Sequence, residues 1–152
     1  MKLFAAILFS VLVLQVAQAK NASKNLPSKI VTYMKENYPN ATKVEWIKAN
    51  NQDYKNTVYQ ADFYDNGLLV ILEITPEGEV LAKETELLTK DIPKDMLFYI
   101  QGHKLKYTAR IDYNDEASVY LLETKFKKHE DFMVLNPTGT SVLHVKKHFL
   151  LF

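Results

Sequence analysis

The stretch that decides the fold is TVYQADFYDNGLLVILEIT, residues 57–75. Two runs rich in β-branched and aromatic residues flank the pair Asn66-Gly67, which is typical of a two-residue β-hairpin turn. With that pair as the turn, one hairpin face holds only apolar cross-strand pairs, which are Phe63–Val70, Ala61–Leu72 and Tyr59–Ile74. The opposite face holds Tyr64–Leu69, Asp62–Ile71 and Gln60–Glu73. Because a slip of one residue would mix these two sets, the pattern predicts the hairpin and its register.

A helix and a strand are expected before this hairpin. Pro27 suits the first turn of a helix, and apolar residues then recur at helical spacing until Pro39 prevents continuation. Residues 42–49, TKVEWIKA, alternate as a strand, and we place Trp46 in the core rather than at a binding hot spot. The predicted core of this half consists of Ile30, Met34, Val44, Tyr59, Phe63, Val70, Leu72 and Ile74.

The chain contains an imperfect internal repeat. LPSKIVTYM (26–34) aligns with IPKDMLFYI (92–100), and ITPEGEVL (74–81) aligns with LNPTGTSVL (135–143) when one extra residue is allowed. A period of about 60 residues with two copies is too long for a solenoid and indicates a duplicated α+β unit.

The expected fold class is therefore α+β. Each of two tandem modules is predicted to consist of a helix followed by a four-stranded antiparallel meander, with the helices on one face of the sheet. The first module spans residues 20–90, and the second, more degenerate module spans residues 91–152. Together the two modules are expected to form one compact domain.

Residues 1–19 have the features of a secretory signal peptide. Lys2 precedes an apolar run, and small residues at Ala17 and Ala19 form a cleavage site. The alternative is a membrane anchor, but the apolar run is shorter than the ~20 residues of a spanning helix. We therefore predict a periplasmic or secreted protein that does not insert into a membrane after cleavage. The chain has no cysteine, which excludes thiol catalysis and disulfides.

Charge and motifs exclude several function classes. The chain has 19 basic and 18 acidic residues, so removing Lys2 with the signal leaves 18 of each. This balance argues against a nucleic-acid partner. A helical arrangement of His144 and His148 would suggest a metal pair, but in a strand they lie too far apart for one ion. The sequence shows no nucleophile motif and no phosphate-binding loop, so we predict no enzyme activity, no cofactor and no metal.

Six landmarks stand in order along the first half, namely Leu26-Pro27, Tyr38-Pro39-Asn40-Ala41, Trp46, Asn66-Gly67, Pro76 and Gly78. This order resembles the PepSY-like family of secreted or periplasmic proteins, common in Bacteroidetes, whose fold is similar to that of the beta-lactamase inhibitor protein. The second half departs from the pattern, because HKLKYTA stands where YPNATKV would be. The resemblance implies helices on one face of a shared sheet and a curved, exposed opposite face, with which the inhibitor protein grips its enzyme. A shared fold does not transfer a partner.

A candidate binding surface follows from the face opposite the predicted core. Tyr64, Leu69 and Ile71 lie there although polar residues are expected, and Val119 and Leu121 extend the surface in the second half. The charged residues at its edge are Asp62, Glu73, Glu123 and Lys125. The alternative, equally weighted, is that a loop or a second subunit covers this surface.

The C-terminal stretch TSVLHVKKHFLLF (140–152) is expected to be the closing strand. In that strand Phe149 and Leu151 would pack inward with Leu143 and Val145, whereas Leu150 and Phe152 would join the candidate binding surface. The rival interpretation is a disordered apolar tail.

Three functions compete at this stage. The leading hypothesis is an exported, non-enzymatic binding protein that holds an unknown protein or peptide on the exposed sheet face. The alternative is a small-ligand or ion-binding protein of the cell envelope that uses the groove between the modules. A hydrolase with an unrecognised site is the least favoured, because no convergent acid–base set appears.

Overall fold

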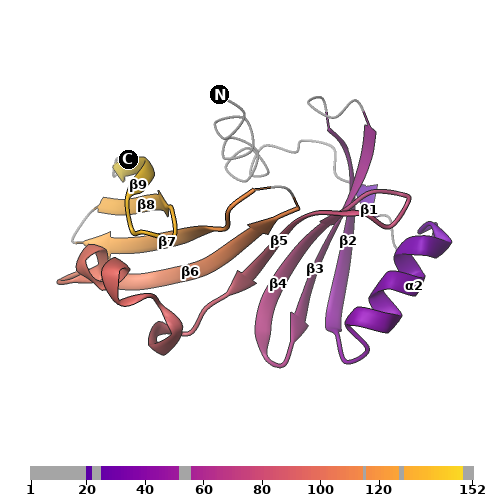
Figure 1. The fold of residues 1–152 in the computed structure, drawn as a ribbon, viewed down its shortest axis with the longest axis horizontal. Coiled ribbons are helices and arrows are strands. Elements are labelled where there is room, and N and C mark those ends of the chain that lie inside the picture. Colours follow the sequence, from indigo (N-terminus) through magenta and orange to yellow (C-terminus); the bar gives the residue numbers. More distant parts are fainter. Residues whose placement is uncertain (1–19, 22–24, 52–55, 115, 127–128, 149–152) are drawn as a thin grey trace.

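The computed structural model describes residues 20–21, 25–51, 56–114, 116–126 and 129–148. These residues form one antiparallel sheet of nine strands that are paired in sequence order (Figure 1). The strands are β1 (Lys20–Asn21), β2 (Thr42–Asn51), β3 (Asn56–Asp65), β4 (Leu68–Ile74), β5 (Val80–Glu86), β6 (Lys104–Tyr113), β7 (Val119–Phe126), β8 (His129–Leu135) and β9 (Ser141–His148). The described helices are α2 (Ser28–Asn37) and the short 3₁₀ segments η2 (Thr89–Asp91) and η3 (Lys94–Ile100).

The β3–β4 hairpin has the register that the sequence predicts. Asp65 pairs with Leu68, and the pairing continues outward to Tyr59 and Ile74. The backbone φ angle of Gly67 is +82°, a value that glycine adopts without the steric cost that other residues bear. The predicted register is therefore confirmed.

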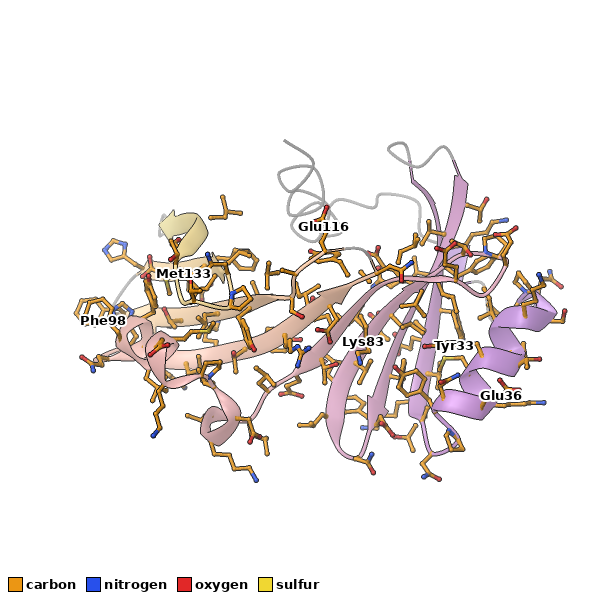
Figure 2. All side chains as sticks on the ribbon, in the orientation of Figure 1. Tyr33, Glu36, Lys83, Phe98, Glu116 and Met133 are labelled. Carbon is orange, nitrogen blue, oxygen red and sulfur yellow. The ribbon has the colours of Figure 1, made fainter. Side chains whose placement is uncertain are left out.

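Helix α2 covers the first half of the sheet. Tyr33 points from α2 toward the strands, whereas Glu36 on the same helix points away from them (Figure 2). Ile30 is fully buried, and the Tyr38 ring meets Phe63 edge to face at a centroid distance of 4.8 Å. Residues of α2 and of strands β2–β4 thus share one apolar core, which supplies most of the stabilisation of this short helix.

The predicted core is correct except at one position. Trp46 is buried as expected, and so are Ile30, Tyr59, Phe63, Val70, Leu72 and Ile74, while Met34 packs half-buried against them. Val44 is 38% exposed, so its assignment to the core is wrong. A register shift between Thr42 and Glu45 distorts β2 beside it, with Lys43 at a φ of +53°.

The predicted division into two tandem modules, each with a helix and four strands, is wrong. Strand β5 pairs directly with β6, from Ala82 opposite Tyr113 to Glu86 opposite Ala109, so the described strands form a single continuous sheet. The second half also lacks a counterpart of α2 among its described residues, because the segment predicted as a helix forms the seven-residue 3₁₀ segment η3. Nucleating an α-helix costs free energy that packing must offset. This segment is short, and Met96 is its one buried residue, so its packing does not offset that cost.

Two glycine turns approach the two helical segments closely. A Cβ atom on Gly78 would lie 3.4 Å from the Lys29 Cβ atom of α2, and one on Gly139 would lie 3.2 Å from the Asp95 carbonyl oxygen of η3. The Tyr99 hydroxyl also donates a hydrogen bond to the Gly139 carbonyl oxygen at 2.9 Å. Each turn therefore packs a helical segment against the sheet. The internal duplication of the sequence stays a prediction.

The register assigns α2 and η3 to the same face of the sheet. A cluster with Ile92 and Met96 forms the core under η3, and it includes Leu122, Met133 and Leu135. The opposite face is called the open face here. By cross-strand pairing it contains Glu45, Gln60, Asp62, Tyr64, Leu69, Ile71, Glu73, Ala82, Glu84, Glu86, Tyr107, Ala109, Ile111, Tyr113, Val119, Leu121, Glu123, Phe132, Val134 and Leu143.

Candidate functional site

Three of the predicted site residues lie together on the open face. Tyr64 pairs with Leu69 across the β3–β4 hairpin. Asp62 pairs with Ile71 two residues further along, on the same face of the sheet. Tyr64 is 39% exposed, and the ammonium group of Lys43 lies 5.3 Å from the centre of its ring. Leu69 and Ile71 are half-buried. The first half thus presents an aromatic and aliphatic surface that solvent reaches in part.

Val119 and Leu121 lie on the same face but are covered. They pair with Ile111 and Ala109 of β6, and their side chains are only 3% and 7% exposed. Together with Val134 these residues form an apolar cluster, against which Tyr107, Tyr113, Phe132 and Leu143 pack half-buried. A partner would therefore meet this half-buried aromatic rim rather than Val119 or Leu121 themselves.

The C-terminal predictions fall partly outside the described residues. Phe149, Leu150, Leu151 and Phe152 are not described by the structure. Leu143 belongs to the apolar cluster of the open face, and Val145 is paired opposite Phe132. The expected role of Phe152 in the binding surface stays a prediction.

A group of three carboxyl side chains occupies the open face beside Ile71. Asp62 of β3 and Glu84 of β5 are the two cross-strand neighbours of Ile71, and Glu73 of β4 lies two residues further along its strand. We call Asp62, Glu73 and Glu84 the carboxyl trio. The sequence shows that Asp62 and Glu73 are close, but it does not reveal Glu84, because a register shift between Glu73 and Ile74 sets the β4–β5 pairing.

Burial raises the pKa of Glu73 to about 7, and the nearby charge of Glu84 adds to this effect. Burial also raises the pKa of Glu84 above its usual value, with a further contribution from Asp62. The Tyr107 hydroxyl acts against this shift, because it donates a hydrogen bond of 2.7 Å to the Glu84 Oε1 atom. The trio therefore holds its protons more tightly than ordinary surface carboxyls do.

The third carboxyl is fixed by a buried amide. Burial raises the pKa of Asp62, the hydrogen bond from Gln60 lowers it, and the charge of Glu45 raises it again. The Gln60 side-chain nitrogen donates to the Asp62 Oδ1 atom at 2.8 Å, and Gln60 is only 8% exposed. A buried amide that orients one carboxyl, and a tyrosine that orients another, give this part of the open face a defined geometry.

The trio lacks positive partners among the described residues. Every salt bridge found there, at an N–O limit of 4.0 Å, involves other acids. Arg110 lies 2.7 Å from Asp112, for example, and the Lys106 ammonium group contacts Glu123 at 3.4 Å. Lys83 neighbours the trio on β5, but the register places it on the helix-bearing face opposite Leu72 (Figure 2). Its ammonium group lies 3.9 Å from Asp112.

A groove lies between α2 and the edge of β2. The groove has a volume of about 400 Å³, and Trp46, Val44, Val31, Met34 and Tyr38 contribute to its mostly apolar lining together with Leu26, Lys35, Pro39 and Ala41. It differs from the expected groove between two modules, since it belongs to the first half alone. Sequence reasoning missed it because Val44 was assigned to the core.

The described residues form neither a metal site nor a membrane-spanning helix. Within the described part of the chain, no three His, Asp or Glu side chains are arranged to hold a metal ion, and the carboxyl trio is included in that statement. None of the described helices has the length and apolar character that a membrane crossing requires.

Solved structures share this fold. A candidate periplasmic protein from Bacteroides eggerthii superimposes with a TM-score of 0.66 at 17% identity, over 80% of this chain and 89% of its own. A DUF2874 family protein from Bacteroides uniformis gives a TM-score of 0.65 at 16% identity, over 80% and 90%. A BLIP-like protein from Bacteroides fragilis gives a TM-score of 0.60 at 20% identity, over 82% and 89%.

These likenesses show a BLIP-like fold in place of the tandem modules. No protein-family model matches the chain, and no curated protein matches its sequence. The expected likeness to the fold of the beta-lactamase inhibitor protein is accordingly confirmed, whereas the resemblance to the PepSY-like family stays a prediction.

Proposed function

We propose that this protein is an exported, non-catalytic binding protein that holds a protein or peptide on its open face. One observation carries the proposal: the core cluster on that face consists of strand residues only, with no described helix over it. On the other face α2 and η3 both contribute to the core. Half-buried aromatic residues on a sheet face without a helix over it are typical of a protein interface, in which aromatic side chains are enriched.

The likeness to a BLIP-like protein supports the choice of the open face but not the choice of a partner. Export is supported by the signal-like residues 1–19, which lie outside the described residues, and by the candidate periplasmic protein of the same fold. N-terminal sequencing of the protein from the producing cell is expected to begin at Lys20. An intact Met1 on membrane-bound material would contradict export with cleavage.

Site-directed photocrosslinking in the producing cell tests the binding function. A photoreactive residue at Leu69, half-buried on the open face, is expected to form an adduct with one discrete envelope protein or peptide. The matched control is the same residue at Glu36, which is exposed on α2 and points away from the sheet (Figure 2). Equal adducts from both positions, or none from Leu69, would contradict the proposal.

The groove between α2 and β2 supports a second candidate function, the binding of a small apolar ligand. The supporting observation is a volume of about 400 Å³ lined by Trp46, which lies in the range of small-molecule sites. Trp46 is the only tryptophan, so its fluorescence reports on the groove. The dye 8-anilinonaphthalene-1-sulfonate is expected to quench it, Val44→Asp to abolish quenching, and Leu69→Asp to leave it unchanged. If the dye quenches the fluorescence of Val44→Asp as strongly as that of the wild type, the groove is not its binding site.

A further inference from the structure

The acidic side chains in the two halves of the sheet have different polar and charged neighbours. In the second half, two buried acids lie close to basic side chains: Glu130 contacts the Lys106 ammonium group, and Asp131 lies 3.8 Å from a ring nitrogen of His103. In the first half, the carboxyl trio is half-buried, and among the described residues its hydrogen bonds come from the neutral groups of Gln60 and Tyr107. Desolvated carboxylates without a counter-charge cost stability, so this arrangement indicates a partner that supplies the charge.

The surroundings of the trio specify what kind of cation fits. The described acids do not converge on a metal ion, and Ile71 separates Asp62 from Glu84 across the strands. A cation with an apolar stem matches this pattern, because the stem can lie on Ile71 while the charged end reaches the carboxylates around it. Lysine and arginine side chains have this construction.

We propose that the first half of the open face receives a lysine or arginine side chain of the bound protein or peptide, seated over Ile71 among Asp62, Glu73 and Glu84. This inference rests on the proposed function, since it names the chemistry of the partner at the same face. Strands β3, β4 and β5, which carry the three acids, lie side by side at the centre of the sheet (Figure 1). The apolar rim around Ile111 and Val119 lies next to them and accepts the neighbouring apolar residues of the partner.

The proposal predicts a dependence of binding on pH. The titratable groups that share this part of the open face are Lys43 and Glu45 of β2, Asp62 and Tyr64 of β3, Glu73 of β4, Glu84 and Glu86 of β5, and Tyr107 and Tyr113 of β6. Burial holds the proton of Glu73 up to about pH 7. A cationic partner therefore binds more tightly at about pH 8, where the trio is ionised, than at about pH 5.5, where it is partly neutral.

Peptide probes test the inference without knowledge of the natural partner. Nuclear magnetic resonance titration with acetyl-Lys-Leu-Lys-Leu-Lys-amide is expected to shift the methyl signals of Ile71 and Ile111 and to leave those of Val31 and Val44 unchanged. The matched anionic peptide, acetyl-Glu-Leu-Glu-Leu-Glu-amide, is expected to shift neither pair. Equal shifts by both peptides, or no shift at Ile71 with the cationic one, would overturn the inference.

Neutral variants identify the groups responsible. Glu73→Gln combined with Glu84→Gln keeps the side-chain shape and is expected to weaken binding of the cationic peptide on the order of tenfold or more. Glu36→Gln is the control, because Glu36 is exposed on α2 and points away from the sheet. Equal losses in both variants would mean that the general negative field attracts the peptide, and would overturn the assignment to the trio.

The crosslinking experiment separates this inference from the proposed function. If the double variant still crosslinks from Leu69 to the same envelope protein, with an undiminished yield at high salt, the binding function stands and the cation inference fails. If the yield falls in the double variant and not in Glu36→Gln, both stand. If Leu69 forms no adduct with any protein while the cationic peptide still binds at Ile71, the cation site stands and the proposed function fails.

Discussion

Glu73 illustrates how the place of one residue in a sheet changes its chemistry. Its strand neighbours on the open face are Gln60 and Ala82, and burial together with the charge of Glu84 raises its pKa to about 7. The sequence alone shows that Glu73 faces away from the core. It does not show this shift, because the shift comes first from burial in the folded sheet and second from the charge of Glu84, whose approach follows from the irregular β4–β5 pairing.

The raised pKa of Glu73 predicts how stability changes with pH. Its pKa is about 7 when folded and near 4.5 when exposed, so between these values the folded state binds more protons than the unfolded state. The free energy of unfolding therefore falls as pH rises through this window. Glu73→Gln removes the ionisation and is expected to be more stable than the wild type at about pH 8, on the order of 1–3 kcal/mol.

Urea denaturation at about pH 5 and about pH 8 measures this effect. Asp62 and Glu84, whose pKa values are also raised, act in the same direction as Glu73. Glu77→Gln, in the exposed turn after β4, is the control and is expected to change nothing. A wild-type stability that rises steadily between the two pH values, with no gain from Glu73→Gln, would show that Glu73 is solvated.

Adjacent positions on β3 provide a direct test of the two sheet faces. Phe63 is fully buried beneath α2, and Tyr64, the next residue, is 39% exposed on the open face. Phe63→Ala is expected to cost about 3–5 kcal/mol because it leaves a cavity, whereas Tyr64→Ala is expected to cost less than about 1 kcal/mol. Chemical denaturation of both variants gives the comparison, and similar losses would contradict the assignment of the faces.

At the scale of the elements, the sequence predicts best where one local signal is sufficient. The β3–β4 hairpin is such a case, since Asn66-Gly67 and the alternation of Tyr59–Asp65 specify the turn and the register together. Segment 92–100 is the opposite case. Its apolar spacing resembles that of α2, but Phe98 is 73% exposed, so the segment buries too little to form an α-helix. The amount of burial depends on distant strands, which a local pattern does not contain.

The turn between β8 and β9 is predicted to be essential for holding η3. Gly139 has a φ of +78°, and a Cβ atom there would lie 3.2 Å from the Asp95 carbonyl oxygen, closer than an ordinary van der Waals contact. Gly139→Ala is therefore expected to destabilise the protein through both backbone strain and this contact. Gly102→Ala is the matched control, because Gly102 has a similar φ of +73° with open space around it, and it is expected to cost about 1–2 kcal/mol.

Thermal unfolding of Gly139→Ala and Gly102→Ala measures how much the close approach to Asp95 adds to the cost of backbone strain. A lower midpoint for Gly139→Ala than for Gly102→Ala is expected, since strain alone acts in the second variant. Equal midpoints would mean that the close approach to Asp95 is relaxed at no cost.

At the scale of the whole molecule, the residue patterns did not reveal the continuous sheet, and only the family resemblance implied that the two halves share one. The internal repeat suggested a boundary near residue 90, and sequence similarity between the halves says nothing about the pairing of β5 with β6. That pairing joins strands on either side of the boundary. The sequence predicts the part of the candidate site in the first half, which is Tyr64, Leu69 and Ile71. The coverage of Val119 and Leu121 was not, because it arises from packing among β6, β7 and β8.

The continuous sheet predicts that the two halves unfold together. Leu122 is fully buried beneath η3 in the second half, and Trp46 is buried in the first half. Leu122→Ala is expected to lower the free energy of unfolding by about 2–5 kcal/mol. Because β5 and β6 share a register of direct pairs, this loss is expected to appear undiminished in the urea midpoint reported by Trp46 fluorescence.

Circular dichroism of the same samples supplies the comparison, since it reports on strands of both halves. Coincident transitions by fluorescence and circular dichroism are expected for the wild type and for Leu122→Ala. Tyr64→Ala serves as a control with an exposed side chain and is expected to leave both midpoints nearly in place. A Trp46 transition that stays at the wild-type midpoint while circular dichroism shows an earlier loss of strands would mean that the halves are energetically independent, despite the single sheet that joins them.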